Sequence, residues 1–308
     1  MDIWLDTDPG FDDWMAWLLI ESHAGFRLRG VSVVAGNAPL ERTLANALAI
    51  RALHGFTTPV YAGCDRPLAQ PQTTAQDVLG AHGMETTGAL LPEVSGEPDA
   101  AHGVHVLIDC VRANPGCITL LAVGPLTNVA AAFALAPELP SLLAGLVIMG
   151  GSTVGGNATA AAEFNIHADP EAAARVFGCG VPVAMFGLNA CRQVAVSAAQ
   201  VQRLQRLQSQ QARIFAGYLD GYVEIARRRG RPFQSLYDPT PVIWLAHPEW
   251  FELPPARVEI ELAGRFTRGM TVCDLRAPAL ARANARVAMK VQGEPALEWA
   301  MATIESRL

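Results

Sequence analysis

Four aspartates surround a single Pro-Gly turn near the start of the chain. They lie between Asp6 and Asp13 in the sequence DTDPGFDD, which follows the apolar run 3–5 and precedes an apolar, helix-like segment at 14–20. This pattern predicts a strand that ends at about Asp6, a turn at Pro9-Gly10 and a helix that starts at about Asp12. Ligands of open α/β sheets bind at this carboxyl end of the strands.

Four carboxylates this close repel one another unless a cation lies among them, because like charges raise each other's pKa. Helix capping is the alternative, since acidic residues are favoured in the first turn of a helix. Capping accounts for one or two of the aspartates but leaves Asp6 and Asp8 unexplained. We therefore predict a cation site at this turn.

Apolar strands alternate with helical segments along most of the chain. Short buried runs at 118–123, 146–149 and 181–186 are typical of parallel strands covered on both faces. The length of 308 residues allows one large domain or two small ones, but no linker-like segment or fixed-period repeat divides the chain. We predict a single α/β domain, residues 1–308, with a mainly parallel, Rossmann-like central sheet covered by helices.

Three local patterns refine this prediction. Residues 64–100 are rich in Pro, Gly and Thr and predict an extended loop, of the kind that often carries function. Residues 198–229 predict one long helix or two. Asp169 and Asp238 each precede a proline and are predicted to cap a helix.

Composition argues against several other classes of protein. The six cysteines are far apart and form no CxxC pair, which argues against a zinc site or a disulfide framework and favours a cytoplasmic protein. The net charge is -6, and the one basic run, 227–231, is interpreted as a solvated helix end, so no nucleic-acid partner is expected. We expect neither a signal peptide nor a membrane span.

The side chains at the predicted strand ends are carboxylates and amides. The set comprises Asp8, Asp13, Asn37, Asn157, Glu163, Asn165 and Asp238. Oxygen-only ligation suits a hard cation, and calcium tolerates a mixture of carboxylates and carbonyls better than magnesium does. Because no phosphate-binding GxxxxGK[ST] or GxGxxG motif accompanies these residues, an uncharged, polyhydroxylated substrate fits them better than a phosphorylated one.

The acidic turn resembles the N-terminal signature of the inosine-uridine preferring nucleoside hydrolases. Matching blocks follow in family order over roughly residues 2–245, namely Gly36-Asn37, GPLTN at 124–128, MGG at 149–151, Asn157, EFN at 163–165, DPEAA at 169–173 and Asp238-Pro239. The resemblance implies the nucleoside hydrolase fold, with calcium-dependent hydrolysis of ribonucleosides to ribose and free base. It also implies a role in purine or pyrimidine salvage and a homo-oligomer, either a dimer or a tetramer.

The resemblance implies roles for individual residues as well. The ligands of one calcium ion would be Asp8, Asp13, the backbone carbonyl of Val123 and Asp238. Asp8 would be the general base that takes a proton from a water on this ion. The ribose hydroxyls would be bound by Asp12, Asn157, Glu163, Asn165 and Asp238, with Asn37, Met149 and His82 nearby.

Two positions depart from the family pattern. Tyr237 stands where many relatives carry a histidine that is thought to protonate the leaving base, and a phenol, with a pKa of about 10, shuttles protons less well. Asn189 and Cys191 stand where relatives often have Asp and Thr, so the resemblance does not fix the preferred base.

Two alternatives to a hydrolase of this family are considered. One is a calcium-dependent nucleoside- or sugar-binding protein with weakened catalysis, which the tyrosine at 237 keeps open. The other is a haloacid dehalogenase-type phosphatase, which also begins with a strand and a DxD motif. That phosphatase needs a basic residue downstream, and the only lysine of the chain is Lys290.

Overall fold

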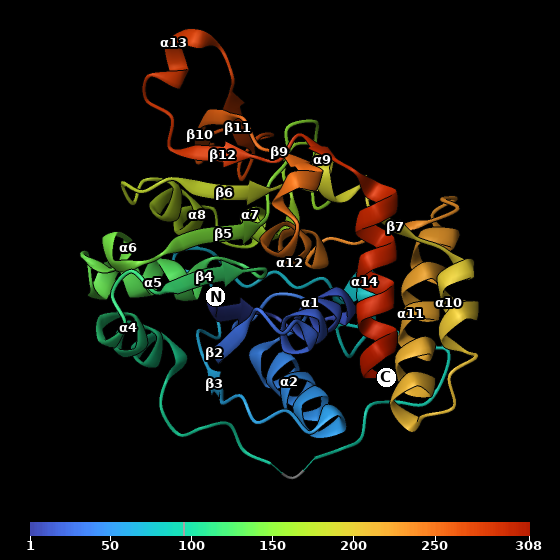
Figure 1. The fold of residues 1–308 in the computed structure, drawn as a ribbon. Helices are drawn as coiled ribbons and strands as arrows, with labels where there is room; N and C mark the ends of the chain where they lie inside the picture. The colour runs from blue at the N-terminus through green and yellow to red at the C-terminus, as the bar shows by residue number, and fades with distance from the viewer. Residues whose placement is uncertain (95) are drawn as a thin grey trace.

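A nine-stranded sheet runs through the centre of the computed structural model, which describes residues 1–94 and 96–308 (Figure 1). Its strands are β1 (Asp2–Thr7), β2 (Arg27–Val33), β3 (Val60–Ala62), β4 (Ile118–Ala122), β5 (Gly145–Met149), β6 (Val183–Phe186), β10 (Pro255–Ile260), β11 (Thr271–Asp274) and β12 (Ala285–Val287). The strand order is β11-β10-β12-β6-β5-β4-β1-β2-β3, and every pair from β12 to β3 is parallel. Within this sheet, as far as the described residues show it, β10 alone pairs antiparallel, with β11 and β12. The prediction of a mainly parallel, Rossmann-like sheet is confirmed.

Helices cover both faces of this sheet (Figure 1). One side carries α1 (Phe11–Ser22), α2 (Leu40–His54), α10 (Ala198–Leu204), α11 (Gln210–Arg228), α12 (Pro239–Ala246) and α14 (Gly293–Arg307). The other side carries α4 (Gly103–Ala113), α5 (Thr127–Leu135), α6 (Leu139–Leu142) and α8 (Pro170–Phe177). The remaining elements are α3 (Gln76–Leu79), α7 (Phe164–Ala168), α9 (Leu188–Cys191), α13 (Ala277–Leu280), a 3-10 helix at Pro248–Trp250, and the short strand pairs β7 (Ala195–Val196) with β8 (Gln234–Ser235) and β9 (Phe251–Glu252) with β13 (Lys290–Val291).

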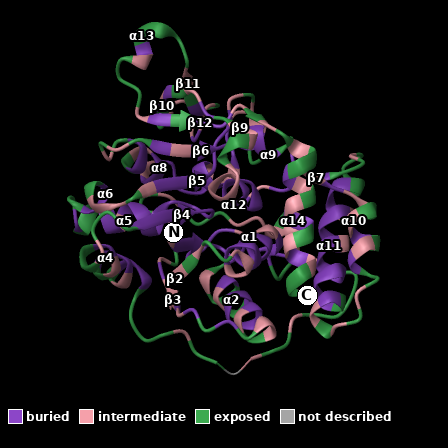
Figure 2. Cartoon of the chain, in the orientation of Figure 1, coloured by how far each residue is buried: buried purple, intermediate pink, exposed green. Residues whose placement is uncertain are grey.

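The buried side chains form two hydrophobic clusters, one on each face of the sheet. The central strands are drawn largely in the colour of buried residues in Figure 2. Strand β1 contributes to both, since Ile3 and Leu5 join the cluster under α1 and α11, whereas Trp4 joins the cluster under α4 and α5. Successive side chains of a strand point to opposite faces, so a central strand buries all of them. This explains why β1 reads as a continuous apolar run.

Several boundaries differ from the sequence-based expectations. Helix α1 begins at Phe11, slightly earlier than the predicted start at about Asp12. The segment 198–229 forms two helices, because Ser209 caps a new one through a bond from the Ala212 N–H. The loop at 64–100, whose residue 95 lies outside the described residues, contains only the short α3 and is tied to α11 by the Leu91 N–H, which donates to the Tyr218 hydroxyl. No described helix is long and apolar enough to span a membrane.

The chain reverses its direction of winding at the centre of the sheet. Strands β2 and β3 lie on one side of β1, whereas β4, β5 and β6 lie on the other. The connections from β1 and β4 therefore leave the sheet on opposite faces and open a crevice between the carboxyl ends of the two strands. The acidic turn follows β1 directly and lies at this crevice.

Candidate active site

A cavity of about 320 Å³ lies at the carboxyl ends of the central strands, a size suited to a small molecule. Ten of the predicted site residues line it, namely Asp8, Asp12, Asn37, Val123, Met149, Asn157, Glu163, Asn165, Tyr237 and Asp238. Asp13 is buried beneath this surface. His82 is exposed and is not among the lining residues, and its backbone carbonyl accepts a bond from the Asn46 side chain.

Asp8 is almost fully buried in the turn after β1. Its Oδ2 accepts the Asn37 N–H at 2.7 Å, and its backbone carbonyl accepts the Asn37 Nδ2 at 3.0 Å. A Cβ at either Gly36 or Gly124 would collide with the Asp8 carboxylate, so both glycines of the sequence motifs are needed for its close approach to the neighbouring loops. Burial and the charge of Asp13 raise the pKa of Asp8 well above its usual range, against the Asn37 hydrogen bond.

Asp13 fills the capping role that the sequence left open. Its Oδ2 accepts the Gly10 N–H at 2.9 Å and the Asn37 Nδ2 at 3.1 Å, and its Oδ1 accepts from the Thr7 hydroxyl. These bonds hold the first turn of α1 to the end of β1. Asp12 does not cap the helix, and its Oδ2 instead accepts a bond from the Tyr222 hydroxyl at 3.0 Å.

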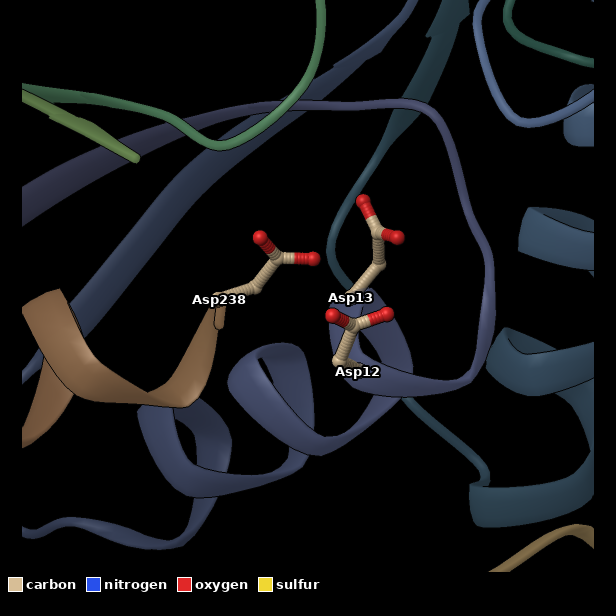
Figure 3. Close-up of side chains that lie close together, drawn as sticks. All are labelled: Asp12, Asp13 and Asp238. Atoms are coloured by element: carbon tan, nitrogen blue, oxygen red, sulfur yellow. The ribbon is translucent and has the colours of Figure 1, made fainter. Parts of the chain in front are cut away.

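Asp238 precedes Pro239 at the start of α12, as predicted, but its side chain makes no capping hydrogen bond. It points instead toward Asp12 and Asp13 (Figure 3). Within the described residues, one oxygen from each of these three carboxylates lies within 4.8 Å of the other two. The sequence expectation placed Asp8 rather than Asp12 in this group; Asp8 lines the same cavity, and its Oδ2 accepts the Asn37 N–H.

The electrostatics of this cluster call for a positive charge. Burial raises the pKa of Asp12 to about 7, and the charge of Asp13 adds to the effect. The pKa of Asp238 is raised well above its usual range by burial and then by the charges of Asp12, Asp13 and Asp8. Every donor is an oxygen, and no capping role occupies Asp238. The residues therefore fit a hard, oxygen-preferring cation such as calcium.

Glu163 and Asn165 line the part of the cavity next to the ends of β4 and β5. Glu163 caps α7, accepting the Asn165 N–H at 3.0 Å and the Gly151 N–H at 2.8 Å, but burial outweighs these bonds and raises its pKa. The Asn165 Nδ2 donates to the backbone carbonyls of Val123 at 2.7 Å and Met149 at 3.1 Å. These contacts join the ends of β4 and β5 and fix the direction of both carbonyls.

Asp6, the first aspartate of the turn, belongs to a separate network. It is fully buried, and its Oδ2 accepts from the Ser32 hydroxyl and from the Asn128 Nδ2 at 2.8 Å. Its Oδ1 has no partner within the described residues, and burial raises its pKa to about 7. Since Asn128 also accepts the Cys64 N–H, Asp6 connects β1, β2, α5 and the 64–100 loop and lies outside the cavity lining.

The cavity also contains residues that the sequence reasoning did not place there. Tyr222, interpreted as a core or interface residue, lines the cavity and bonds to Asp12 and to the Ser235 carbonyl. Arg229 and Arg231 line it as well, although the sequence predicted a solvated helix end. Asn189 and Cys191 are not among the lining residues, and Asn189 supports the backbone instead by donating to the Ala288 carbonyl.

Comparison with known proteins gives a consistent picture. Residues 3–298 match the family model described as inosine-uridine preferring nucleoside hydrolase. The chain is 36% identical to the inosine-uridine preferring nucleoside hydrolase of Crithidia fasciculata, covering 94% of this chain and 93% of that protein. It is 38% identical to the pyrimidine-specific ribonucleoside hydrolase RihA of Shewanella woodyi, covering 92% and 91%. The solved purine-preferring ribonucleoside hydrolase from Gardnerella vaginalis superposes with a TM-score of 0.92 at 27% identity, over 100% of this chain and 99% of that one.

Proposed function

Because this chain belongs to the inosine-uridine preferring nucleoside hydrolase family and is a ribonucleoside N-hydrolase, we propose that it uses calcium to cleave ribonucleosides to ribose and free base by direct attack of water. The observation that carries this proposal is that buried carboxylates and amide and carbonyl oxygens line one and the same cavity at the switch point of the sheet. The family match also removes the phosphatase alternative.

Hydrolases of this family depend on a metal ion, and the aspartate cluster is the natural place for it. We infer that the ion is calcium and that Asp8, Asp13, the Val123 carbonyl and Asp238 ligate it. The oxygen-only donor set and the carbonyl fixed by Asn165 support this assignment. When bound, calcium would make a ligated water more acidic and would hold the vicinal hydroxyls of the ribose.

The protein residues contribute the other parts of the reaction. Asp8, which lines the cavity, accepts the proton that the attacking water loses, and a cation beside it would keep its carboxylate ionised and able to act as a general base. Cleavage of the C1′–N bond places positive charge on the sugar ring, as in glycoside hydrolysis. The fixed carboxylates of Asp12 and Glu163 and the amide oxygens of the lining stabilise that charge.

The cavity lining offers hydrogen-bond acceptors and donors for the ribose hydroxyls. We propose that they bind Asp12, Asn157, Glu163, Asn165 and Asp238, with Asn37 and Met149 completing the wall. The exposed His82 would reach the substrate only if its loop closed over the cavity. Tyr237 precedes Asp238 and lines the same cavity, and we propose that its hydroxyl donates a hydrogen bond to the leaving base.

Release of reducing sugar from a panel of ribonucleosides, with and without calcium, tests this function. We expect hydrolysis of at least one ribonucleoside and near-complete loss of activity in EGTA, restored by calcium. Binding of a nucleoside without turnover would favour the alternative, a calcium-dependent binding protein with weakened catalysis. Turnover that is equal in EGTA would contradict the metal-dependent mechanism.

Replacing Tyr237 with histidine is expected to increase the turnover of purine nucleosides by about tenfold or more, because imidazole titrates near neutrality and can protonate the leaving base. Burial, by contrast, raises the pKa of the Tyr237 phenol above its usual value. Steady-state rates with inosine and adenosine measure the effect.

The Tyr237→Phe variant is the matched control for this substitution, since it removes the hydroxyl and keeps the ring. It should hydrolyse every nucleoside more slowly than the wild type. If Tyr237→His gives no gain with either purine nucleoside, protonation at this position does not limit the reaction.

A further inference from the structure

The carboxylates and amides account for only part of the cavity lining. The remaining lining residues include the apolar Val78, Leu79 and Ile225, the aromatic Tyr222, and Arg231 with its neighbour Gln234. A nucleoside consists of a polyhydroxylated sugar and a flat base with polar edges. Since the acidic part of the lining suits the sugar, the base is left with the rest of the lining, which includes these apolar residues and Arg231 besides the polar Thr73, Asp77 and His167.

Arg231 is held at this place by the end of helix α11. Gly230 adopts a positive φ of 70°, its N–H donates to the Arg227 carbonyl, and the Arg231 N–H donates to the Ala226 carbonyl at 2.9 Å. These two bonds form a Schellman motif, which ends the helix and reverses the chain. The motif turns Arg231 back toward the cavity, whereas Arg227 and Arg228 stay exposed and pair with Glu224.

Arg231 is half-buried, and its guanidinium has no ion pair within residues 1–94 and 96–308. Its Nη2 donates to the Oε1 of the buried Gln234 at 3.4 Å, and the group also lies against the Tyr237 phenol. Arg229 and Arg192 line the same cavity, but both are exposed. Arg231 is therefore the partly desolvated arginine of the three, and its charge acts through less water.

We propose that Arg231 is a catalytic residue that stabilises the departing base as an anion, an inference that rests on the proposed function. Arginine can only donate hydrogen bonds, so the preferred base presents an exocyclic oxygen, as uracil and hypoxanthine do. As the water oxygen bonds to C1′, its proton passes to Asp8 and the electron pair of the C1′–N bond stays on the base nitrogen. The guanidinium neutralises this charge until solvent protonates the released base.

Two substrates separate this role from a structural one. The first is the faster of uridine and inosine, whose base leaves poorly as an anion. The second is p-nitrophenyl β-D-ribofuranoside, whose leaving group is a much weaker base and needs no neighbouring cation. We expect Arg231→Gln to lower kcat/KM for the nucleoside by about 100-fold, the loss typical of removing one fixed donor at a developing anion, and for the nitrophenyl riboside by less than about fivefold.

Two further variants complete the experiment. Arg231→Lys keeps the charge and should recover part of the nucleoside activity. Arg227→Gln removes an exposed arginine of the same helix end, outside the cavity lining, and should behave as the wild type. The proposal would be overturned if Arg231→Gln lowered kcat/KM equally for both substrates, or if it left kcat/KM for the nucleoside unchanged. A wild-type enzyme that cleaves neither substrate would instead overturn the proposed function.

Discussion

Replacing Asp8 with asparagine is expected to lower kcat for ribonucleoside hydrolysis by about 10³-fold or more, because general base catalysis typically contributes 10²–10⁴-fold and the residue is also a proposed metal ligand. The asparagine keeps an oxygen that can accept the Asn37 N–H, so the loop after β2 retains its contact. The fold should therefore persist. Reducing-sugar release and circular dichroism, measured on the same sample, separate loss of chemistry from loss of structure.

Asp65→Asn is the control for this substitution, since Asp65 is an exposed aspartate that pairs with its neighbour Arg66 at the surface. Its activity and melting temperature should match those of the wild type. Retention of hydrolysis within tenfold in Asp8→Asn would exclude Asp8 as the general base. A variant that loses its circular dichroism spectrum would show instead that the hydrogen bonds of Asp8 are required for folding.

The architecture could be predicted from the sequence because the buried strands are visible as short, continuous apolar runs. Runs such as 118–123 and 146–149 are almost entirely apolar, which is typical of strands in a parallel sheet covered on both faces. The break between α10 and α11 was harder to predict, since the apolar spacing continues across it and the capping Ser209 is one polar residue among several. Helix starts were predicted to within a few residues, because capping residues and prolines do not define the first residue of a helix more closely than this.

The acidic part of the site was predictable for a similar reason: its members follow strand ends, and parallel strands bring those ends to one edge. Tyr222 and Arg231 could not be placed in this way. They lie more than 200 residues after the acidic turn, on or just beyond a helix that packs alongside the sheet, and only the tertiary fold brings them to the cavity. The run 227–231 carried a signal in Gly230, whose positive φ marks the point where the chain turns back.

Removal of the metal is expected to lower both activity and stability. A ligand that binds only the folded state stabilises it by mass action, by about 2.7 kcal/mol at one hundred times its Kd. For a chain of this size such a change corresponds to a decrease of about 4 °C in Tm. Differential scanning calorimetry in EGTA, and after addition of calcium or magnesium, measures the effect, and calcium should restore more of it than magnesium.

The pH dependence of that stability distinguishes an ion at the aspartate cluster from an ion elsewhere. In the metal-free protein the pKa of Asp12 is raised to about 7, and those of Asp8 and Asp238 are raised as well, above an unfolded value near 3.8. Between the pKa of the unfolded state and the raised pKa of the folded state, the folded protein binds more protons than the unfolded protein. The free energy of unfolding therefore decreases as the pH rises from about 4 through 7.

A cation at the cluster favours the ionised carboxylates, lowers their pKa and flattens this slope. Asp6, whose pKa is also raised to about 7, lies outside the cavity lining and contributes the same slope with and without metal. The difference in Tm between the calcium-loaded and metal-free proteins should therefore widen between pH 5 and pH 8. A constant difference over this range would place the stabilising ion away from these buried aspartates.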